Sequence, residues 1–167
     1  MANTSDDAFT ALMAAVDPPL IIVTTAVDGA RSGCLVGFHA QSSIDPPRYS
    51  VWLSKANHTY GLAVRSSHLG VHFLTDSDRP LAALFGEHTG DEVDKFAGLD
   101  VSHGLGGVPL LTGCSRRLVL QRAALLDEGG DHVCFVGEVV SCSADGSFMP
   151  LRLSQVDDFT PGHPADD

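Results

Sequence analysis

The alternation of apolar and polar residues predicts a chain made mainly of short β-strands. The residues between the strand patterns are typical of tight turns: Asp28-Gly29 is a hairpin dipeptide, and residues 127–131 form a natural hairpin loop. The strand patterns lie at residues 20–27, 33–38, 49–53, 68–75, 110–112, 116–126 and 132–143.

Helical patterns are fewer and shorter. One helix is predicted over residues 5–16 and is ended by Asp17-Pro18-Pro19, and another is predicted over residues 81–85. The large apolar side chains of the first helix share one face: Phe9, Leu12, Met13 and Val16.

Many strands with tight turns and few helices predict a mainly β fold, a β-barrel with short peripheral helices, rather than a doubly wound sheet. We expect residues 1–17 to form a helix that packs on the barrel. Residues 18–155 would form the barrel domain, and residues 156–167 a flexible tail.

Composition narrows the class of protein. The 167 residues suit one domain with a real core, and 44% hydrophobic residues with a mean hydropathy of +0.11 predict autonomous folding. Ten basic residues against 21 acidic ones give a net charge of −11, which argues against nucleic-acid binding. The sequence shows no membrane-length apolar run and no signal-like N-terminus. The four cysteines form no C-x-x-C pair, so we expect reduced thiols in a cytoplasmic protein.

The stretch from Tyr49 to Val64 is the strongest candidate for ligand binding. A strand is followed by Ser54, Lys55, Asn57, His58 and Thr59, and then by an apolar helical pattern. Asn57 is a good N-cap, and hydroxyls, a lysine and helix-start N–H groups suit a phosphate. An ordinary capped helix after an ordinary strand explains the same residues.

Other constellations are weaker. Residues 104–107 are rich in glycine, but a proline and a strand follow them instead of a helix, so the dinucleotide fingerprint is absent. No G-x-S-x-G is present, and Cys34 has no local base, which favours a core cysteine. An acidic loop could gather a metal but lacks a ligand pattern, so no metal site is predicted: Glu87, His88, Asp91, Glu92 and Asp94.

His132 is a candidate proton donor or anion ligand. It follows Gly129-Gly130-Asp131 and begins an apolar strand, where an imidazole can face a cleft. A turn histidine bonded to Asp131 or to backbone explains its place equally well.

Four motifs in order resemble the flavin reductase family of FMN-binding split barrels. Ser43-Ile44-Asp45-Pro46-Pro47 is similar to the family's S-x-[DE]-P-P, and Lys55-Ala56-Asn57-His58-Thr59 to its basic loop ending in Ser or Thr. Phe85 with Asp94-Lys95-Phe96 resembles F…DKF, and Gly130-Asp131-His132 with Gly137-Glu138-Val139 resembles its G-D-H hairpin. The resemblance covers residues 20–153.

The resemblance implies a homodimer with an FMN, or FAD, at each of two interface sites and NAD(P)H as co-substrate. It implies that hydride passes from nicotinamide to flavin, and that reduced flavin then either leaves for a partner monooxygenase or reacts in place. Lys55, Asn57, His58 and Thr59 would hold the phosphate, and Ser43 would contact the ribityl chain or ring. His132 would face the nicotinamide. The other implied binding residues are Ser54 in the phosphate loop, Lys95 and Phe96 at the border, and Leu35, Val36, Gly37 and Phe38 along the ring edge.

The last of these segments departs from the family pattern. The family commonly has T-x-[NS]-S where this chain has Leu35-Val36-Gly37-Phe38, so only backbone donors face the ring edge. The departure keeps two alternatives open: a flavin-binding protein for storage or electron relay without turnover, and a split barrel that holds deazaflavin or haem.

Overall fold

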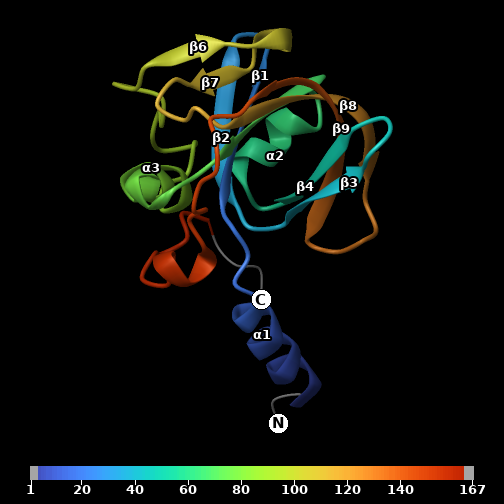
Figure 1. Cartoon of the computed structure of the whole chain (residues 1–167), viewed down its shortest axis with the longest axis vertical. Helices are drawn as coiled ribbons and strands as arrows, with labels where there is room; N and C mark the ends of the chain where they lie inside the picture. The colour runs from blue at the N-terminus through green and yellow to red at the C-terminus, as the bar shows by residue number, and fades with distance from the viewer. Residues whose placement is uncertain (1–3, 164–167) are drawn as a thin grey trace.

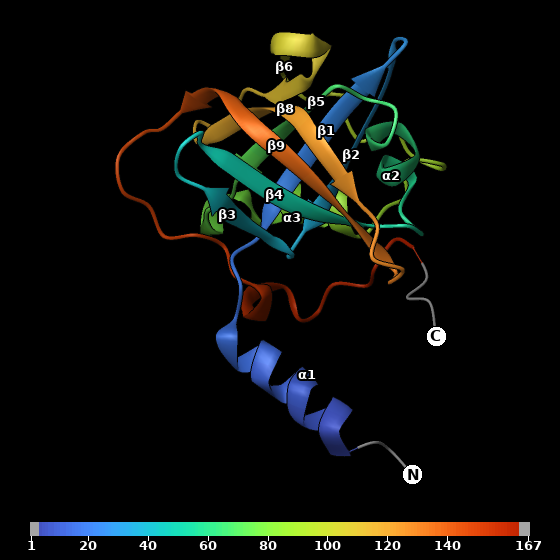
Figure 2. The same cartoon turned by 90° about the vertical axis from the view of Figure 1, so that its right-hand side faces the viewer.

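The computed structural model describes residues 4–163, and a curled seven-stranded antiparallel sheet forms most of it (Figures 1 and 2). The strand order is β2-β1-β5-β8-β9-β4-β3. A separate pair consists of β6 (Val101–His103) and β7 (Pro109–Leu111). The strands of the main sheet are β1 (Ile21–Val27), β2 (Ala30–Val36), β3 (His39–Ser43), β4 (Arg48–Ser54), β5 (His68–Phe73), β8 (Arg117–Leu126) and β9 (His132–Ser143).

Three α-helices accompany the sheet. They are α1 (Thr4–Val16), α2 (His58–Ala63) and α3 (Arg79–Gly86). Three single 3₁₀ turns complete the described structure: η1 (Asp76–Asp78), η2 (Leu105–Gly107) and η3 (Leu153–Val156). The mainly β class with few short helices is therefore confirmed.

The core divides into two clusters because β1 is covered on both of its faces. Successive side chains of a strand point to opposite faces. Ile21 and Val23 therefore enter the cluster inside the curled sheet, with Val51 and Phe135, while Ile22 enters the cluster under α3. All of these side chains are almost fully buried. The apolar run of residues 20–23, which is followed by the buried Thr24 and Thr25, reflects this double burial.

Two strands were not predicted from the sequence: the three-residue β6, and β3. Residues 41–43 lie between two predicted strands, where a turn is the default, but they belong to β3, which pairs with β4 from His39↔Val51 to Ser43↔Arg48. Three polar or small side chains on an edge strand that is exposed to water carry no apolar alternation. The turn instead lies at residues 44–47, where the two prolines stand.

Helix α1 forms as predicted, but it does not pack on the barrel of its own chain. It projects away from the sheet (Figures 1 and 2), and its large apolar side chains are exposed. The carboxylate of Asp17 directs the chain at its base: it accepts from the N–H and the hydroxyl of Ser154, at 2.7 Å each. The expectation of a packed helix is wrong for a single chain, because the chain turns outward at this anchor.

The tail contacts the rest of the protein over residues 156–163. Val156 is buried in the cluster under α3, and the guanidinium of Arg79 contacts both the Asp158 carboxylate and the ring of Phe159. The N–H of Gly162 donates to Gly86 O at 3.1 Å. The sequence did not predict these contacts, and the flexibility of the tail stays a prediction; residues 164–167 lie outside the described part.

Candidate flavin site

The connection from β4 to α2 has the capped geometry that the sequence predicts. Asn57 has an extended backbone, and its Oδ1 atom accepts from the N–H of Thr59 at 2.9 Å. The N–H of Asn57 donates in turn to Ser54 O at 3.0 Å. The cap holds the 54–59 loop in one conformation against the end of β4.

The start of β9 lies beside this loop. Ser54 pairs with His132 in the β4–β9 ladder, and the N–H of Lys55 donates to Asp131 O at 2.8 Å. The ammonium of Lys55 donates to Asp127 Oδ1 at 3.0 Å. The pKa of Asp127 lies below its ordinary value because the Gly129 N–H, and then Lys55, donate to the carboxylate. The loop cation is thus paired with a carboxylate of the β8–β9 hairpin.

Phe38 and His132 form an aromatic pair at the same end of the sheet. Their ring centroids are 4.9 Å apart with an angle of 50° between the planes, and Phe38 is 59% exposed. His132 Nδ1 lies 2.7 Å from Asp131 Oδ1, so the bond to Asp131 that the sequence left open is present. The exposed ring of Phe38 thus offers an aromatic surface next to the loop, and the tilted His132 ring lies against it.

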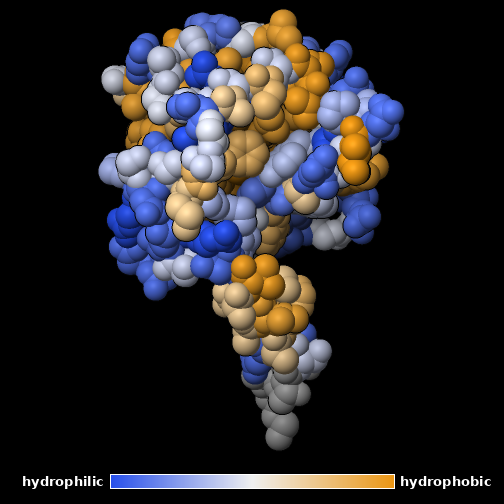
Figure 3. Space-filling view, in the orientation of Figure 1, coloured by the Kyte–Doolittle hydropathy of each residue, from blue (hydrophilic) through white to orange (hydrophobic). Residues whose placement is uncertain are grey.

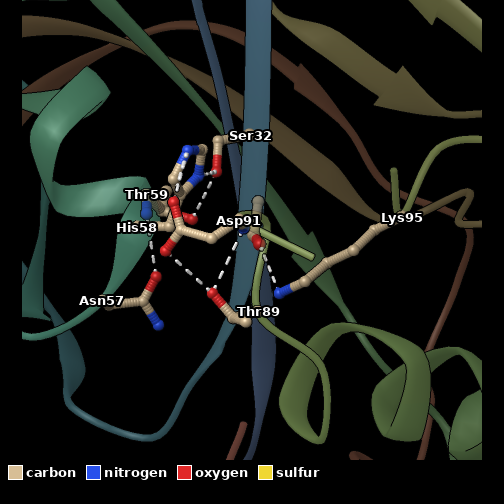
Figure 4. Close-up of polar contacts among 8 residues, drawn as sticks. Ser32, Asn57, His58, Thr59, Thr89, Asp91 and Lys95 are labelled. Atoms are coloured by element: carbon tan, nitrogen blue, oxygen red, sulfur yellow. Dashed lines mark hydrogen bonds and ion pairs between the residues drawn. The ribbon is translucent and has the colours of Figure 1, made fainter. Parts of the chain in front are cut away.

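His58 is the centre of a second polar cluster (Figure 4). Its Nδ1 atom lies 2.9 Å from the hydroxyl of Ser32, and its Nε2 atom lies 3.7 Å from Asp91 Oδ1. The Ser32 hydroxyl is also 2.9 Å from the Thr59 hydroxyl, and both residues are buried. Thr59 therefore uses its side chain inside the protein, whereas His58 and Asp91 reach the surface.

A cleft of about 300 Å³ adjoins this cluster between β2 and the loop that follows α3. The loop passes close to the imidazole: a Cβ on Gly90 would lie 2.6 Å from His58 Nδ1. A larger residue at this position would therefore have to displace either the His58 ring or the loop. The lining residues are Arg31, Ser32, Gly33, Gly90, Asp91, Glu92, Val93, Asp94, Lys95 and Phe96.

Lys95 lines the cleft with its backbone while its ammonium points into the protein. The Nζ atom donates to the carbonyls of Gly33 and Phe85, at 3.0 Å each, and burial lowers the pKa of Lys95. Phe96 is also buried and packs edge-to-face on Phe85, with centroids 5.4 Å apart. These two residues fasten the loop to β2 and α3, and their side chains are not presented to a ligand.

The four residues implied at the ring edge divide into two pairs. Leu35 and Val36 pair with Ile22 and Ile21 within the β1–β2 ladder, and their side chains pack in the two core clusters. Gly37 and Phe38 follow the strand, and Phe38 is the exposed residue of the four, whereas Leu35 and Gly37 are partly buried. The Phe38 carbonyl accepts from Trp52 N–H at 2.9 Å, which holds this segment against β4.

Ser43 is not brought together with the other residues in one chain. It faces Arg48 at the start of β4, whereas Ser54 ends that strand, and six residues of strand separate them by about 20 Å. Gln41, Ser42, Ser43, Ile44 and Asp45 line a shallow hollow of their own.

Cys34 behaves as the core cysteine that the sequence favours. It is 2% exposed, and burial raises the pKa of its thiol to about 11 despite a hydrogen bond with Thr59. The thiol stays protonated at neutral pH and is a poor nucleophile.

Sequence reasoning missed Ser32, Asp91 and Asp127 as neighbours of the loop. Asp91 lies in the acidic loop for which no metal site was predicted, and Asp127 lies in a hairpin turn. No local motif links either one to residues 55–59, since the contacts span 33 and 72 positions in the sequence. Charge is the one signal in the sequence that could have pointed to these neighbours. Basic residues are scarce and acidic loops are many, so a loop with a lysine is expected to lie near a carboxylate.

Comparison with known proteins identifies the family. Residues 13–155 match the flavin reductase like domain. The chain belongs to this family. It is 30% identical over 123 residues to a ferric-chelate reductase (NAD(P)H) of Archaeoglobus fulgidus, covering 72% of each protein. It is 31% identical over 130 residues to the HsaB reductase subunit of a flavin-dependent monooxygenase of Rhodococcus jostii, covering 78% of this chain and 65% of HsaB.

A solved structure shows the same architecture. The FMN-binding protein of Thermus thermophilus, crystallised with 1-cyclohex-2-enone, superposes with a TM-score of 0.70 and 28% identity, over 75% of this chain and 70% of that one. The curled half-barrel is therefore the fold of flavin-binding split barrels. Over residues 4–163, no helix is long and apolar enough to span a membrane, and no three His, Cys, Asp or Glu residues gather as metal ligands.

Proposed function

We propose that this flavin reductase family member binds FMN, with FAD as a second candidate, and catalyses hydride transfer from NAD(P)H to it. The observation that carries the proposal is the juxtaposition of the Phe38–His132 pair with the Lys55 loop at one end of β4 and β9. An exposed aromatic side chain suits a planar ring, and a loop with cationic and N–H donors suits an anionic tail. The relatives named as reductases support the same chemistry.

The residues present fit a flavin phosphate. Lys55, Asn57 and His58 offer an ammonium, an amide and an imidazole from one capped loop, and Asp127 and Asp91 are the anions that face two of these groups. When bound, FMN supplies a ring that accepts hydride. Phe38 would pack beside the ring, the N–H groups of Gly37 and Phe38 would face its edge, and His132 would orient the nicotinamide.

Ser54, Thr59, Lys95 and Phe96 then have supporting roles. The hydroxyl of Ser54 accepts from Ala56 N–H at 3.3 Å, and Thr59 holds Ser32 beneath His58. Lys95 and Phe96 fix the loop that carries Asp91. Leu35 and Val36 would contribute backbone position, and Ser43 would reach a flavin only from a second chain.

A homodimer is part of the proposal. The outer face of the β8-β9-β4-β3 region opposes the core and carries no charged side chain at its centre. Ser50 faces Val136, and Trp52 faces Cys134, while the neighbours Val51 and Phe135 point inward. Arg48 with Glu138 lies at one end of this face, and His132 lies at the other. We define the outer face by Ala40, Ser50, Trp52, Ala124, Leu126, Cys134 and Val136.

An uncharged sheet face with a half-buried tryptophan suits a second copy of the chain. Because the face ends at His132, a flavin next to Phe38 would lie at the border between two copies. That position would also give Ser43 of the second chain a route to the site. We further propose that reduced flavin leaves for a monooxygenase, as the name of the HsaB relative suggests.

The test of the reaction follows the nicotinamide absorbance of NADH or NADPH mixed with FMN and purified protein. We expect oxidation well above the protein-free rate. Equal rates with and without protein would refute the reductase.

A second candidate is a flavin-binding protein without NAD(P)H turnover. The specific observation is that Leu35 and Val36 direct their side chains into the core, so the ring edge lacks hydroxyl and amide side chains. A yellow chromophore kept through desalting, together with no NADH oxidation, would select this function. The absorption spectrum of the freshly purified protein also separates flavin from deazaflavin or haem.

A further inference from the structure

Helix α1 carries an unpartnered apolar face. Its four large apolar side chains are 63, 59, 40 and 60% exposed, and they follow the i, i+3, i+4, i+7 spacing of one helical face. The opposite face carries Ala11 and Ala14. The exposed face consists of Phe9, Leu12, Met13 and Val16, which we call the arm face.

The arm is held away from its own barrel by several bonds. Asp17 has a left-handed φ of 52° and binds Ser154 through its carboxylate, while Arg152 donates to the Asp17 carbonyl at 2.9 Å. The N–H of Leu153 donates to Pro18 O at 3.0 Å. Because these bonds fix the base of the helix, folding the arm back would break them. Its own barrel is therefore not the surface that covers the arm face.

The charge of the arm argues against a membrane surface. The first turn of α1 carries Asp6 and Asp7, and no lysine or arginine occurs between Thr4 and Ala30. Helices that lie on anionic bilayers present basic residues on their polar face. This helix presents acids and alanines instead.

We infer that the arm face packs against a second copy of this chain and extends the interface of the outer face. Two observations support a second copy. The arm leaves the barrel below the sheet region that carries the outer face (Figure 2), and the hydropathy of the surface shows the apolar base of the arm (Figure 3). In addition, a two-fold arrangement buries both arms at once, because each copy supplies one arm and one receiving surface.

The area that a stable interface must bury also favours a contribution from the arms. A stable interface buries about 800 Å² on each partner. The outer face has seven side chains, and Ser50 and Cys134 among them are already buried in one chain. The arms add four large exposed apolar side chains from each copy to that contact.

The test compares two aspartate variants of the 167-residue chain, with the substitutions on opposite faces of α1. We expect Leu12→Asp to raise the dimer dissociation constant at least about tenfold, since it places a charge in an apolar contact. Ala11→Asp adds the same charge to the opposite face of the helix. We expect this variant to change the dimer dissociation constant by less than about threefold. Sedimentation over a range of protein concentrations measures both, and circular dichroism verifies that each variant is folded.

A second measurement tests directly whether the arm face is covered in the dimer. In a Cys142→Ser background, which removes the one exposed thiol among the described residues, Leu12→Cys should react with a thiol reagent far more slowly above the dimerisation concentration than below it. Ala11→Cys should react equally fast at both concentrations. Equal reactivity of Leu12→Cys at both concentrations would overturn the inference.

The inference rests on the homodimer of the proposed function, and the outcomes separate the two. A wild-type chain that is monomeric at all concentrations refutes both. A wild-type dimer whose dissociation constant is the same in Leu12→Asp refutes the arm and leaves the homodimer standing. NADH oxidation with FMN reports on the reductase independently of both.

Discussion

The Asp91 carboxylate lies 3.7 Å from Nε2 of His58, on the other side of the imidazole from the Ser32 hydroxyl at 2.9 Å. The ring is thus held between a buried neutral partner and an exposed anion (Figure 4). A phosphate that binds at His58 meets a carboxylate already in place. The acidic loop after α3 therefore competes with the anionic ligand for the same edge of the His58 imidazole.

Removing that competitor should strengthen FMN binding. We expect Asp91→Asn to lower the FMN dissociation constant by about threefold or more, because one repulsive charge near the phosphate is lost. Flavin fluorescence titration measures it. Glu92→Gln is the matched control, since it removes an equal charge from the same loop away from His58. Equal effects of the two substitutions would show that only the net charge of the loop matters.

The ion pair of Lys55 with Asp127 gives a second prediction. Lys55→Ala should weaken FMN binding by about tenfold or more, because a charge-assisted bond to the phosphate is lost. Riboflavin, which lacks the phosphate, should bind Lys55→Ala as it binds the wild-type protein. Isothermal titration with the two flavins separates the cases. Equal losses for both flavins would argue against a phosphate at Lys55.

Asp127→Asn tests the other partner of that pair. The substitution frees the ammonium and keeps the shape of the turn, in which Asp127 Oδ1 also accepts from Gly129 N–H. We expect FMN to bind this variant at least as tightly as the wild-type protein. Weaker FMN binding would mean that the turn, and not the ammonium, shapes the loop.

The fold was predictable from sequence where strand patterns are long or doubly buried. Residues 20–27 and 132–143 give β1 and β9 almost to the residue, since their apolar runs report burial directly. β3 was missed because an exposed edge strand needs no apolar alternation. The outward course of α1 was missed because amphipathic spacing shows that a face is buried, but not against which chain.

The candidate site was also predictable from sequence only in part. Asn57 was predictable as a cap because capping is a local bond between residues two positions apart. The fate of Lys95 was not, since its buried ammonium depends on carbonyls of β2 and α3 that only the tertiary fold brings near. Family motifs place residues around a ligand, but they do not show which side chains face it.

His132 should affect turnover more than flavin binding. His132→Gln removes the imidazole beside Phe38, and we expect kcat for NADH oxidation to fall about tenfold or more if the ring orients or protonates the reactants. FMN affinity should stay within about threefold. His103→Gln, in the distant strand β6, is the control for loss of a histidine. Unchanged kcat in His132→Gln would remove this residue from the reaction.

His72 makes the fold sensitive to acid. It is fully buried: Nδ1 donates to Ile22 O at 3.2 Å, and Nε2 accepts from Leu111 N–H at 3.0 Å, which fixes the neutral ring. Burial lowers the pKa of His72 to about 4, against an ordinary value of 6.5 in the unfolded chain. Between these values the unfolded state binds the extra proton. The stability present above pH 6.5 is therefore lost as the pH falls towards 4, by about 3 kcal/mol in total.

Denaturant unfolding between pH 7.5 and 4.5 measures this dependence. His72→Gln can keep a donor and an acceptor but cannot titrate, so we expect a lower free energy of unfolding at pH 7.5 and a shallower decline towards pH 4.5. A residual slope is expected from His39, whose pKa is also lowered by burial. His103→Gln, at an exposed position, should keep the full wild-type slope. An equally steep decline in His72→Gln would assign the acid sensitivity to other groups.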